Sequence, residues 1–206
     1  GIINPLGERI TYEYDQNGRL TVGKNTNGDA FVTNEYDSNG RVINQTDDRG
    51  YQITFNYTDT EKGLKTECIG ADGDITTVYS DERGNVTKVI SAAGAVSTYE
   101  YDDKDNKVRA VDTYGNEYNY SYDEKGNLIS YSSDISEEVN LTYDERGNIT
   151  AVTSPGSTAG IYNYDENGKL ISAADGDMRC TYGYNEAGKL ISVTREGKGT
   201  TTYTYD

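Results

Sequence analysis

A tyrosine followed by a turn-forming segment recurs ten times along the 206-residue chain, at intervals of 20 to 22 residues. The segment is most regular as YDEKGN and YDERGN, and its anchoring tyrosines are Tyr14, Tyr36, Tyr57, Tyr79, Tyr101, Tyr122, Tyr143, Tyr164, Tyr184 and Tyr205. A fixed period of this length is typical of repeat proteins, in which each repeat buries its apolar side chains against its neighbours. We therefore expect residues 1–206 to form one array of nine to ten repeats, with no separate second domain.

Each period contains two turn signals. The first follows the anchoring tyrosine and opens with Asp or Asn, whose side chain can accept hydrogen bonds from backbone amides two residues further on. A glycine closes this turn and supplies the positive φ that hairpin turns need; these glycines are Gly18, Gly40, Gly84, Gly126, Gly147, Gly168 and Gly188. In the fifth repeat, DDKDNK, Asn106 is expected to take the place of glycine. The second turn lies about half a period later, as in TNGD and ADGD.

Two turns in about 21 residues leave room for two short strands, and the residues between turns alternate with a period of two. The positions in phase with the anchors are largely aromatic or aliphatic, and the positions between them are mostly Thr, Glu, Gln and Asn. The sequence therefore predicts an all-β fold: a repetitive antiparallel meander of β-hairpins that forms a curved, single-layer sheet. One face is expected to be aromatic and the other polar, and no helix is predicted.

The overall composition narrows the range of functions. Only 33% of the residues are hydrophobic, the mean hydropathy is −0.82 and the net charge is −16, yet 20 periodically placed tyrosines favour order over disorder. The acidic charge argues against nucleic acid or an anionic membrane as partner. No stretch approaches the roughly 20 apolar residues of a membrane helix. The start, GIINPLGER, does not have the pattern of a signal peptide and suggests a mature portion or an excised fragment.

The residues that most enzymes use are absent or placed without a pattern. The chain has no histidine, which removes the commonest general base and metal ligand. The carboxylate pairs Asp47–Asp48, Asp102–Asp103 and Glu137–Glu138 fall in turns or on the polar face, and Asp72-Gly73-Asp74 lacks the further ligands of a calcium loop. Cys68 and Cys180 lie five repeats apart and are expected to be free thiols. We therefore predict no enzyme activity, no catalytic residue, no metal and no cofactor.

The motif Y-x-Y-D-x-x-G-[RN]-[LIV] resembles the YD repeat of Rhs proteins, teneurins and the Tc-toxin C component. The best matches are YEYDQNGRL from Tyr12, YSYDEKGNL from Tyr120 and YNYDENGKL from Tyr162, and the resemblance runs from Tyr12 to the end of the chain. The third and fourth repeats, YTDTEKGL and YSDERGNV, depart from the motif by shifting the aspartate. The resemblance implies hairpins that spiral into a hollow shell, which in bacterial relatives encloses a C-terminal toxin and in teneurins forms part of an adhesion receptor. Neither a plug with an Asp–Pro–Gly motif nor an effector domain is present, so the chain is expected to be an open slice of shell wall.

These observations lead to one preferred function and one alternative. The preferred function is a non-catalytic structural segment of the shell of a secreted or cell-surface protein, with a bacterial source favoured and with the rest of the shell and an enclosed C-terminal effector as partners. The isolated slice is also expected to associate with itself through its sheet edges. The alternative is a carbohydrate- or cell-surface-binding module in which glycans stack on the tyrosine-rich face, at Tyr99, Tyr118, Tyr120, Tyr162 and Tyr182. Neither nucleic acid binding nor membrane insertion is expected.

Overall fold

The computed structural model describes residues 1–3, 5, 7 and 9–205. These residues form strands joined by turns, and they contain no helix. Contacts along the chain divide it into two compact units, Gly1–Tyr99 and Glu100–Asp206.

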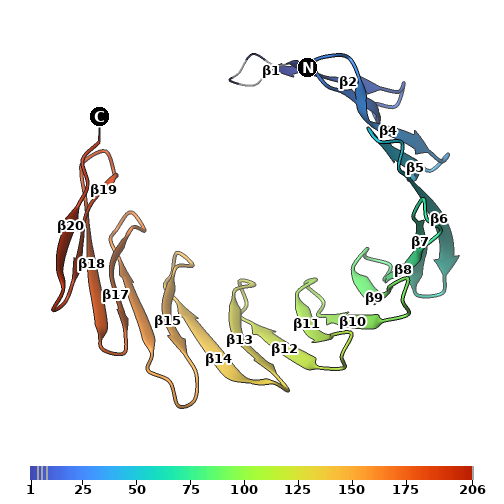
Figure 1. Ribbon diagram of the computed structural model, residues 1–206. Coiled ribbons are helices and arrows are strands. Elements are labelled where there is room, and N and C mark those ends of the chain that lie inside the picture. Colours follow the sequence, from blue (N-terminus) through green and yellow to red (C-terminus); the bar gives the residue numbers. More distant parts are fainter. Residues whose placement is uncertain (4, 6, 8, 206) are drawn as a thin grey trace. The chain divides into compact units, whose positions relative to one another are not determined.

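The first unit is an antiparallel meander in which each strand pairs with the next one in the sequence (Figure 1). Its strands are β1 (Ile2–Ile3), β2 (Arg9–Tyr14), β3 (Leu20–Lys24), β4 (Ala30–Tyr36), β5 (Val42–Asp47), β6 (Gln52–Thr60), β7 (Gly63–Ile69), β8 (Ile75–Ser80), β9 (Val86–Ile90) and β10 (Val96–Tyr101), the last of which extends two residues past the unit's end.

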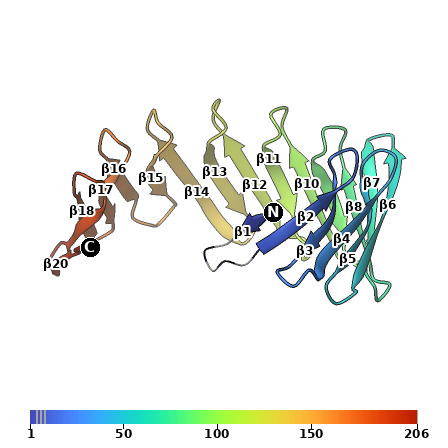
Figure 2. The same cartoon turned by 90° about the horizontal axis from the view of Figure 1, so that it is seen from above.

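The second unit repeats the same arrangement. Its strands are β11 (Lys107–Val111), β12 (Glu117–Tyr122), β13 (Leu128–Ser133), β14 (Ser136–Tyr143), β15 (Ile149–Thr153), β16 (Gly160–Tyr164), β17 (Leu170–Asp175), β18 (Met178–Tyr184), β19 (Leu190–Arg195) and β20 (Gly199–Thr202). Within each unit the hairpins stand side by side in one layer (Figure 2). The predicted all-β meander of hairpins is therefore confirmed.

The pairing register separates two faces of the sheet. Residues directly opposite each other on neighbouring strands point to the same face. Tyr118 lies opposite Ala110, and Tyr120 lies opposite Tyr131, on what we call the tyrosine face. The residues between them point the other way, onto the polar face, where Asn119 lies opposite Arg109. The predicted period of two is thus confirmed.

A single layer leaves little room for a core. Among the described residues, the buried hydrophobic side chains are Ala110, Cys180 and Val193, with exposed fractions of 7–8%. All three lie on the tyrosine face: Ala110 is opposite Tyr118, Cys180 opposite Ala173, and Val193 opposite Tyr182. Burial is therefore spread thinly along this face, and each repeat is stabilised mainly by its two neighbours.

Candidate functional site

The most regular feature of the chain is the turn after each anchoring tyrosine, and Asp144 shows its geometry. One carboxylate oxygen of Asp144 accepts hydrogen bonds from the backbone N–H groups of Arg146 and Asn148, both at 2.9 Å. The other accepts one from the side-chain amide of Asn148 at 2.8 Å. The N–H of Gly147 donates to the Asp144 carbonyl at 3.1 Å, which closes a type I turn with glycine at its fourth position. The aspartate therefore organises the turn, and its carboxylate is fully engaged in doing so.

The other repeats use the same chemistry. The carboxylate or amide oxygen that opens the turn accepts bonds from backbone N–H groups two and four residues on, or four residues on alone, at Asp15, Asp37, Asp81, Asp102, Asp123, Asp165 and Asn185. The predicted turn glycines, Gly18, Gly40, Gly84, Gly126, Gly147, Gly168 and Gly188, have φ between 77° and 93°. Several second turns are built alike, for example at Asp47 and Asp112.

The fifth repeat corrects one expectation. Asp105, with φ of 66°, takes the glycine position there, and Asn106 does not. The N–H of Asp105 donates to the Asp102 carbonyl at 3.2 Å, as the glycine N–H does elsewhere. Asn106 instead donates its side-chain amide to the Asp102 carboxylate at 2.9 Å, which is the role of Asn148 in its own repeat. The expected position was wrong by one residue, because Asp, like Asn, is tolerated in the left-handed region.

The anchoring tyrosines join each turn to the one before it. The hydroxyl of Tyr143 donates to the backbone carbonyl of Leu128 at 2.7 Å, across about 15 residues of sequence. Five further anchors make the equivalent bond at 2.6–3.0 Å: Tyr36 to Leu20, Tyr57 to Val42, Tyr122 to Lys107, Tyr184 to Leu170 and Tyr205 to Leu190. Each bond reaches the first residue of one strand from a tyrosine in the next strand or, for Tyr205, just beyond it. Successive repeats are therefore tied together close to the turns.

The other anchors are Tyr14, Tyr79, Tyr101 and Tyr164. Tyr14 belongs to the first repeat and is 60% exposed. Tyr101 and Tyr164 hold the usual place directly before the turn aspartate, and both are half-buried. Tyr79 lies opposite Lys88, and Ser80 is the residue that pairs with Val86 before the turn. Tyr79 consequently points to the polar face, where the ammonium of Lys88 lies 5.7 Å from its ring centre.

The residue after the turn glycine adds a second link between repeats, which was not predicted from the sequence. The guanidinium of Arg19 lies 4.7 Å from the ring centre of Tyr36, and that of Arg41 lies 4.4 Å from the ring centre of Tyr57. Lys169 and Lys189 approach Tyr184 and Tyr205 in the same way, at 5.4 and 4.8 Å. Such contacts between a cation and a ring are favourable by about 0.5–1 kcal/mol at exposed sites. The signal was present in the sequence, because Arg, Lys or Asn follows almost every turn glycine.

The turn hydrogen bonds also change the acidity of the aspartates. Donation from Asn148, by its side chain and then by its backbone N–H, lowers the pKa of Asp144 below the ordinary value of 3.8. Asn127 does the same for Asp123, and the backbone N–H of Arg41 is the largest cause of the lowered pKa of Asp37. The carboxylates are therefore held in the ionised form, whereas a general acid at neutral pH requires a raised pKa.

The five tyrosines predicted as a ligand-stacking face are all half-buried. Tyr118, Tyr120, Tyr162 and Tyr182 lie on the tyrosine face of the second unit, and Tyr99 is the last residue of the first unit. Burial raises the pKa of Tyr182, and for Tyr118 burial acts together with a hydrogen bond from its hydroxyl to Asp112 at 3.2 Å. A groove of about 630 Å³ on this face is lined by Tyr131, which was not predicted, and by Tyr162.

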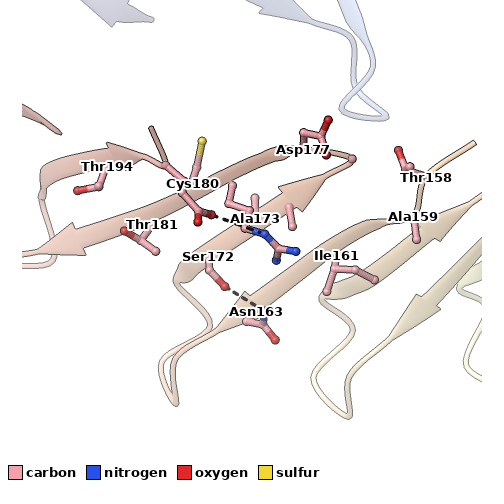
Figure 3. A pocket seen from close by; sticks show the side chains of 14 residues that line it. Thr158, Ala159, Ile161, Asn163, Ser172, Ala173, Asp177, Cys180, Thr181 and Thr194 are labelled. Carbon is pink, nitrogen blue, oxygen red and sulfur yellow. Dashed lines mark hydrogen bonds and ion pairs between the residues drawn. The ribbon is translucent and has the colours of Figure 1, made fainter. Parts of the chain in front are cut away.

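Another groove, of about 680 Å³, lies on the opposite, polar face of the second unit. Figure 3 shows Asn163, Ser172, Ala173, Thr181 and Ile161 around it, with Asp177 at one end. The amide of Asn163 donates to the Ser172 hydroxyl at 2.9 Å. The two carboxylates of this groove are those of Asp177 and Glu196, and Glu196 forms an exposed ion pair with Arg179 at 3.6 Å.

The carboxylate pairs and the two cysteines singled out in the sequence occupy turns, an exposed strand or packed positions. Asp47 and Asp102 open turns, and Glu137 and Glu138 are exposed in β14. Cys68 and Cys180 are free, as predicted, and burial raises the pKa of Cys68. In the described part of the chain, no three His, Cys, Asp or Glu side chains gather closely enough to hold a metal ion. Residues with described placement also include no helix of the length and hydrophobicity needed to cross a membrane.

Comparison with solved structures identifies the fold. The crystal structure of TcdB2-TccC3-TEV superposes with a TM-score of 0.57 at 15% identity, over 96% of this chain and 13% of that chain. A structure of the Photorhabdus luminescens Tc holotoxin pore gives a TM-score of 0.46 at 13% identity, over 94% of this chain and 18% of that one. The present chain thus spans less than a fifth of the length of either protein. No curated protein sequence matches it significantly.

The family assignment rests on the sequence of the second half and part of the first. Residues 75–206, which are more than half of the chain, match the family described as Teneurin YD-shell. The matched stretch contains the turns at Asp81, Asp102, Asp123 and Asp144, with the hydrogen bonds described above. The chain belongs to the Teneurin YD-shell family.

Proposed function

We propose that the chain is a non-catalytic wall segment of a YD-repeat shell, that residues 1–206 act as one repeat array, and that the shell belongs to a secreted or cell-surface protein. The observation that carries the proposal is the row of tyrosine-to-carbonyl hydrogen bonds between successive repeats. These bonds use the anchoring side chain of the repeat to hold neighbouring hairpins together. The aspartates, which are the other recurring polar groups, are occupied within the turns.

The proposed partners are the rest of the shell and an effector enclosed by it. Strand β20 ends the meander through its pairing with β19, and its exposed residues Gly199–Thr202 carry neither a charge nor a proline. Unprotected edge strands of this kind accept a further strand. The same edge would account for self-association of the isolated chain.

Protection of enclosed material is the property that tests the wall function. The full-length gene product should be treated with protease before and after the wall is weakened by the double substitution Asp123→Ala and Asp144→Ala. We expect the region enclosed by the intact shell to resist cleavage and the double variant to expose it. The matched control is Glu124→Ala with Glu145→Ala, at the neighbouring exposed positions of the same two turns. Equal cleavage of all three proteins would contradict a wall function.

A second candidate function, binding of glycans to the tyrosine face, is favoured by the groove between Tyr131 and Tyr162. A side chain at Gly160 would come within 3.0 Å of the Tyr162 hydroxyl, so glycine there leaves room for the Tyr162 ring beside the strand. An aromatic ring and the nearby Asp175 carboxylate are suited to a sugar ring and its hydroxyls. A glycan array tests this: specific binding that is lost in Tyr162→Ala and kept in Tyr79→Ala, on the polar face, would support it, and the absence of any specific binding would exclude it.

A further inference from the structure

Tyr131 and Tyr162 differ from the anchoring tyrosines because their hydroxyl groups are not used to hold the array together. Six anchors donate to a backbone carbonyl, and Tyr118 donates to Asp112. Within the described part of the chain, the hydroxyls of Tyr131 and Tyr162 form no hydrogen bond. Both side chains line the groove of about 630 Å³ on the tyrosine face of the second unit. This volume lies within the range of about 300–1,000 Å³ that is usual for small-molecule sites.

Gly160 places the Tyr162 ring in this groove. Gly160 begins β16, is buried, and lies opposite Val152 on one side and Asp175 on the other. A Cβ at this position would lie 3.0 Å from the Tyr162 hydroxyl and 3.4 Å from its Cε2, so the phenol end of the ring lies directly over the glycine. The φ of Gly160 is not positive, so the backbone does not require glycine here. Glycine in a strand often marks the close approach of a ligand or of another group.

Asp175 gives the groove its charge. Of the described residues that line the groove, Asp175 alone is charged. Because it is paired with Gly160 across two neighbouring strands, its side chain lies on the same face as the Tyr162 ring and close to the phenol end of that ring. Its carboxylate accepts one long hydrogen bond, of 3.5 Å, from the Thr158 hydroxyl. The carboxylate of Asp144, by contrast, accepts three hydrogen bonds within its turn. Asp175 can therefore bond a ligand without breaking a turn.

The rest of the groove combines apolar side chains with hydroxyl groups. Val139 and Val152 line it from β14 and β15, the two strands between those that carry the tyrosine rings. The loop between β15 and β16 brings Ser154, Ser157 and Thr158 to the groove. A sugar ring has C–H groups on its faces and hydroxyls around its edge, so aromatic and aliphatic side chains beside a few hydrogen-bonding groups suit it.

We propose that this groove selects a hexosamine with a free, protonated amino group, which pairs with the Asp175 carboxylate while the sugar ring lies against Tyr162. The inference rests on the glycan-binding candidate function and names the class of sugar. Three features favour a cation: a carboxylate forms strong hydrogen bonds with an ammonium group, the face of an aromatic ring attracts a cation, and a net charge of −16 draws cations to the chain and repels anions. Acidic sugars are therefore disfavoured, and neutral sugars bind without the ion pair.

The order of affinity among three monosaccharides tests this selection. Glucosamine is a cation in mildly acidic buffer, N-acetylglucosamine is neutral and glucuronate is an anion. Their dissociation constants are measured by NMR titration, with the backbone amide of Gly160 as a reporter of the groove. Because Asp175 is exposed, glucosamine should bind up to about fivefold more tightly than N-acetylglucosamine, and glucuronate should bind most weakly. Equal binding of glucosamine and N-acetylglucosamine, or tighter binding of glucuronate, would overturn the proposal.

A matched pair of variants separates the groove from general attraction by an acidic protein. Asp175 and Asp177 lie on either side of Gly176, and replacing either one by Asn changes the net charge equally. Asp177 stands at the end of the groove on the opposite, polar face (Figure 3). Asp175→Asn should bind glucosamine and N-acetylglucosamine equally, whereas Asp177→Asn should keep the wild-type preference. Loss of the preference in both variants, or in neither, would overturn the proposal.

Gly160→Ala tests the placement of the ring. The added methyl group would push the Tyr162 phenol away from the strand, so glucosamine and N-acetylglucosamine should both bind more weakly while the preference between them is kept. Circular dichroism verifies that the sheet is intact. Unchanged affinities in a folded Gly160→Ala protein would overturn the proposed contact with Tyr162.

The glycan-binding function and the choice of sugar fail in different ways. If none of the three sugars shifts the resonances of the wild-type groove, the glycan-binding function is lost together with this inference. If N-acetylglucosamine binds in the groove and glucosamine binds no more tightly, the glycan-binding function stands and the selection of a cationic sugar alone is overturned.

Discussion

The hydroxyl of Tyr143 donates a hydrogen bond of 2.7 Å to the backbone carbonyl of Leu128, one repeat earlier in the chain. Leu128 begins β13 and Tyr143 ends the adjacent β14. The bond therefore ties together two turns that lie at the same ends of neighbouring strands. Tyr36, Tyr57, Tyr122, Tyr184 and Tyr205 make the same bond, so one tyrosine position links neighbouring strands in repeat after repeat.

Removing this hydroxyl should weaken the fold without changing its packing. In Tyr143→Phe the ring remains, and the half-buried Leu128 carbonyl loses a partner, which typically costs about 1 kcal/mol of unfolding free energy. The control is Tyr131→Phe, because the Tyr131 side chain is 38% exposed and lines a groove. Urea unfolding of the three proteins measures the difference. Equal midpoints for Tyr143→Phe and Tyr131→Phe would contradict the linking role of the anchor.

The turn glycines can be tested where space is not a factor. Gly147 has φ of 87°, and the nearest atom to a Cβ built there is the Asn127 Oδ1 at 4.0 Å. Gly147→Val should therefore destabilise the chain through backbone strain alone, by roughly 1–3 kcal/mol. Gly126→Val, at φ of 85°, should behave alike, and Glu124→Ala should be nearly silent because that side chain is exposed in the turn. A thermal melt of Gly147→Val that matches the wild type would refute the strain argument.

The turn aspartates predict how stability depends on pH. Hydrogen bonds from Asn127 and Asn148 lower the folded-state pKa of Asp123 and Asp144 below the ordinary 3.8. A group with a lowered folded pKa contributes stability that is fully present above its unfolded pKa and is lost as the pH falls through the folded value. The chain should therefore keep a constant unfolding midpoint near neutral pH and lose stability progressively below about pH 4.

A double variant isolates this effect. In Asp123→Asn with Asp144→Asn, the one amide oxygen can still accept the two backbone bonds of each turn, whereas the bond from the side-chain amide of Asn127 or Asn148 and the charge are lost. The guanidinium chloride concentration at the unfolding midpoint should change less steeply with pH in the acid range than it does in the wild type. Glu124→Gln with Glu145→Gln changes the net charge equally and controls for general repulsion. If both double variants reduce the loss of stability at acid pH to the same extent, the turn bonds are not the cause of that loss.

The sequence predicted the regular parts of the array because turn chemistry and alternation are local. The positions of Gly126 and Gly147, and the face on which Tyr118 and Tyr120 lie, follow from residues within one repeat. The contact of Arg19 with Tyr36 was not predicted, because it joins positions 17 residues apart whose proximity depends on the strand register. The third repeat also differs: β6 and β7 pair up to Thr60 and Gly63, which leaves the two-residue turn Glu61–Lys62 in place of the usual one.

For the two faces of the sheet, too, the local features were predictable and the features that depend on strand register were not. Alternation predicts which residues share a face, but the contacts that form across that face depend on several strands together. The ion pairs of Arg109 and the hydroxyl pair of Thr194 and Thr200 depend on which residues lie opposite each other. The pairing register of neighbouring strands is set by turn lengths and bulges, and the periodicity of the sequence does not reveal these.

Asp105 offers a test in the stabilising direction. It occupies the turn position that glycine fills in seven other repeats, with φ of 66°. A left-handed conformation costs an ordinary L-residue roughly 1–2 kcal/mol, and glycine would remove this strain from the folded state. Glycine also gives the unfolded chain more conformational freedom, which lowers the unfolding free energy by about 0.4–1 kcal/mol. Asp105→Gly should therefore raise the unfolding free energy by about 0.5–1 kcal/mol. Asp103→Gly, at the exposed second position of the same turn, is the control and should destabilise the chain. Chemical denaturation that ranks Asp105→Gly below the wild type would show that the aspartate side chain contributes more to this turn than the strain of its backbone removes.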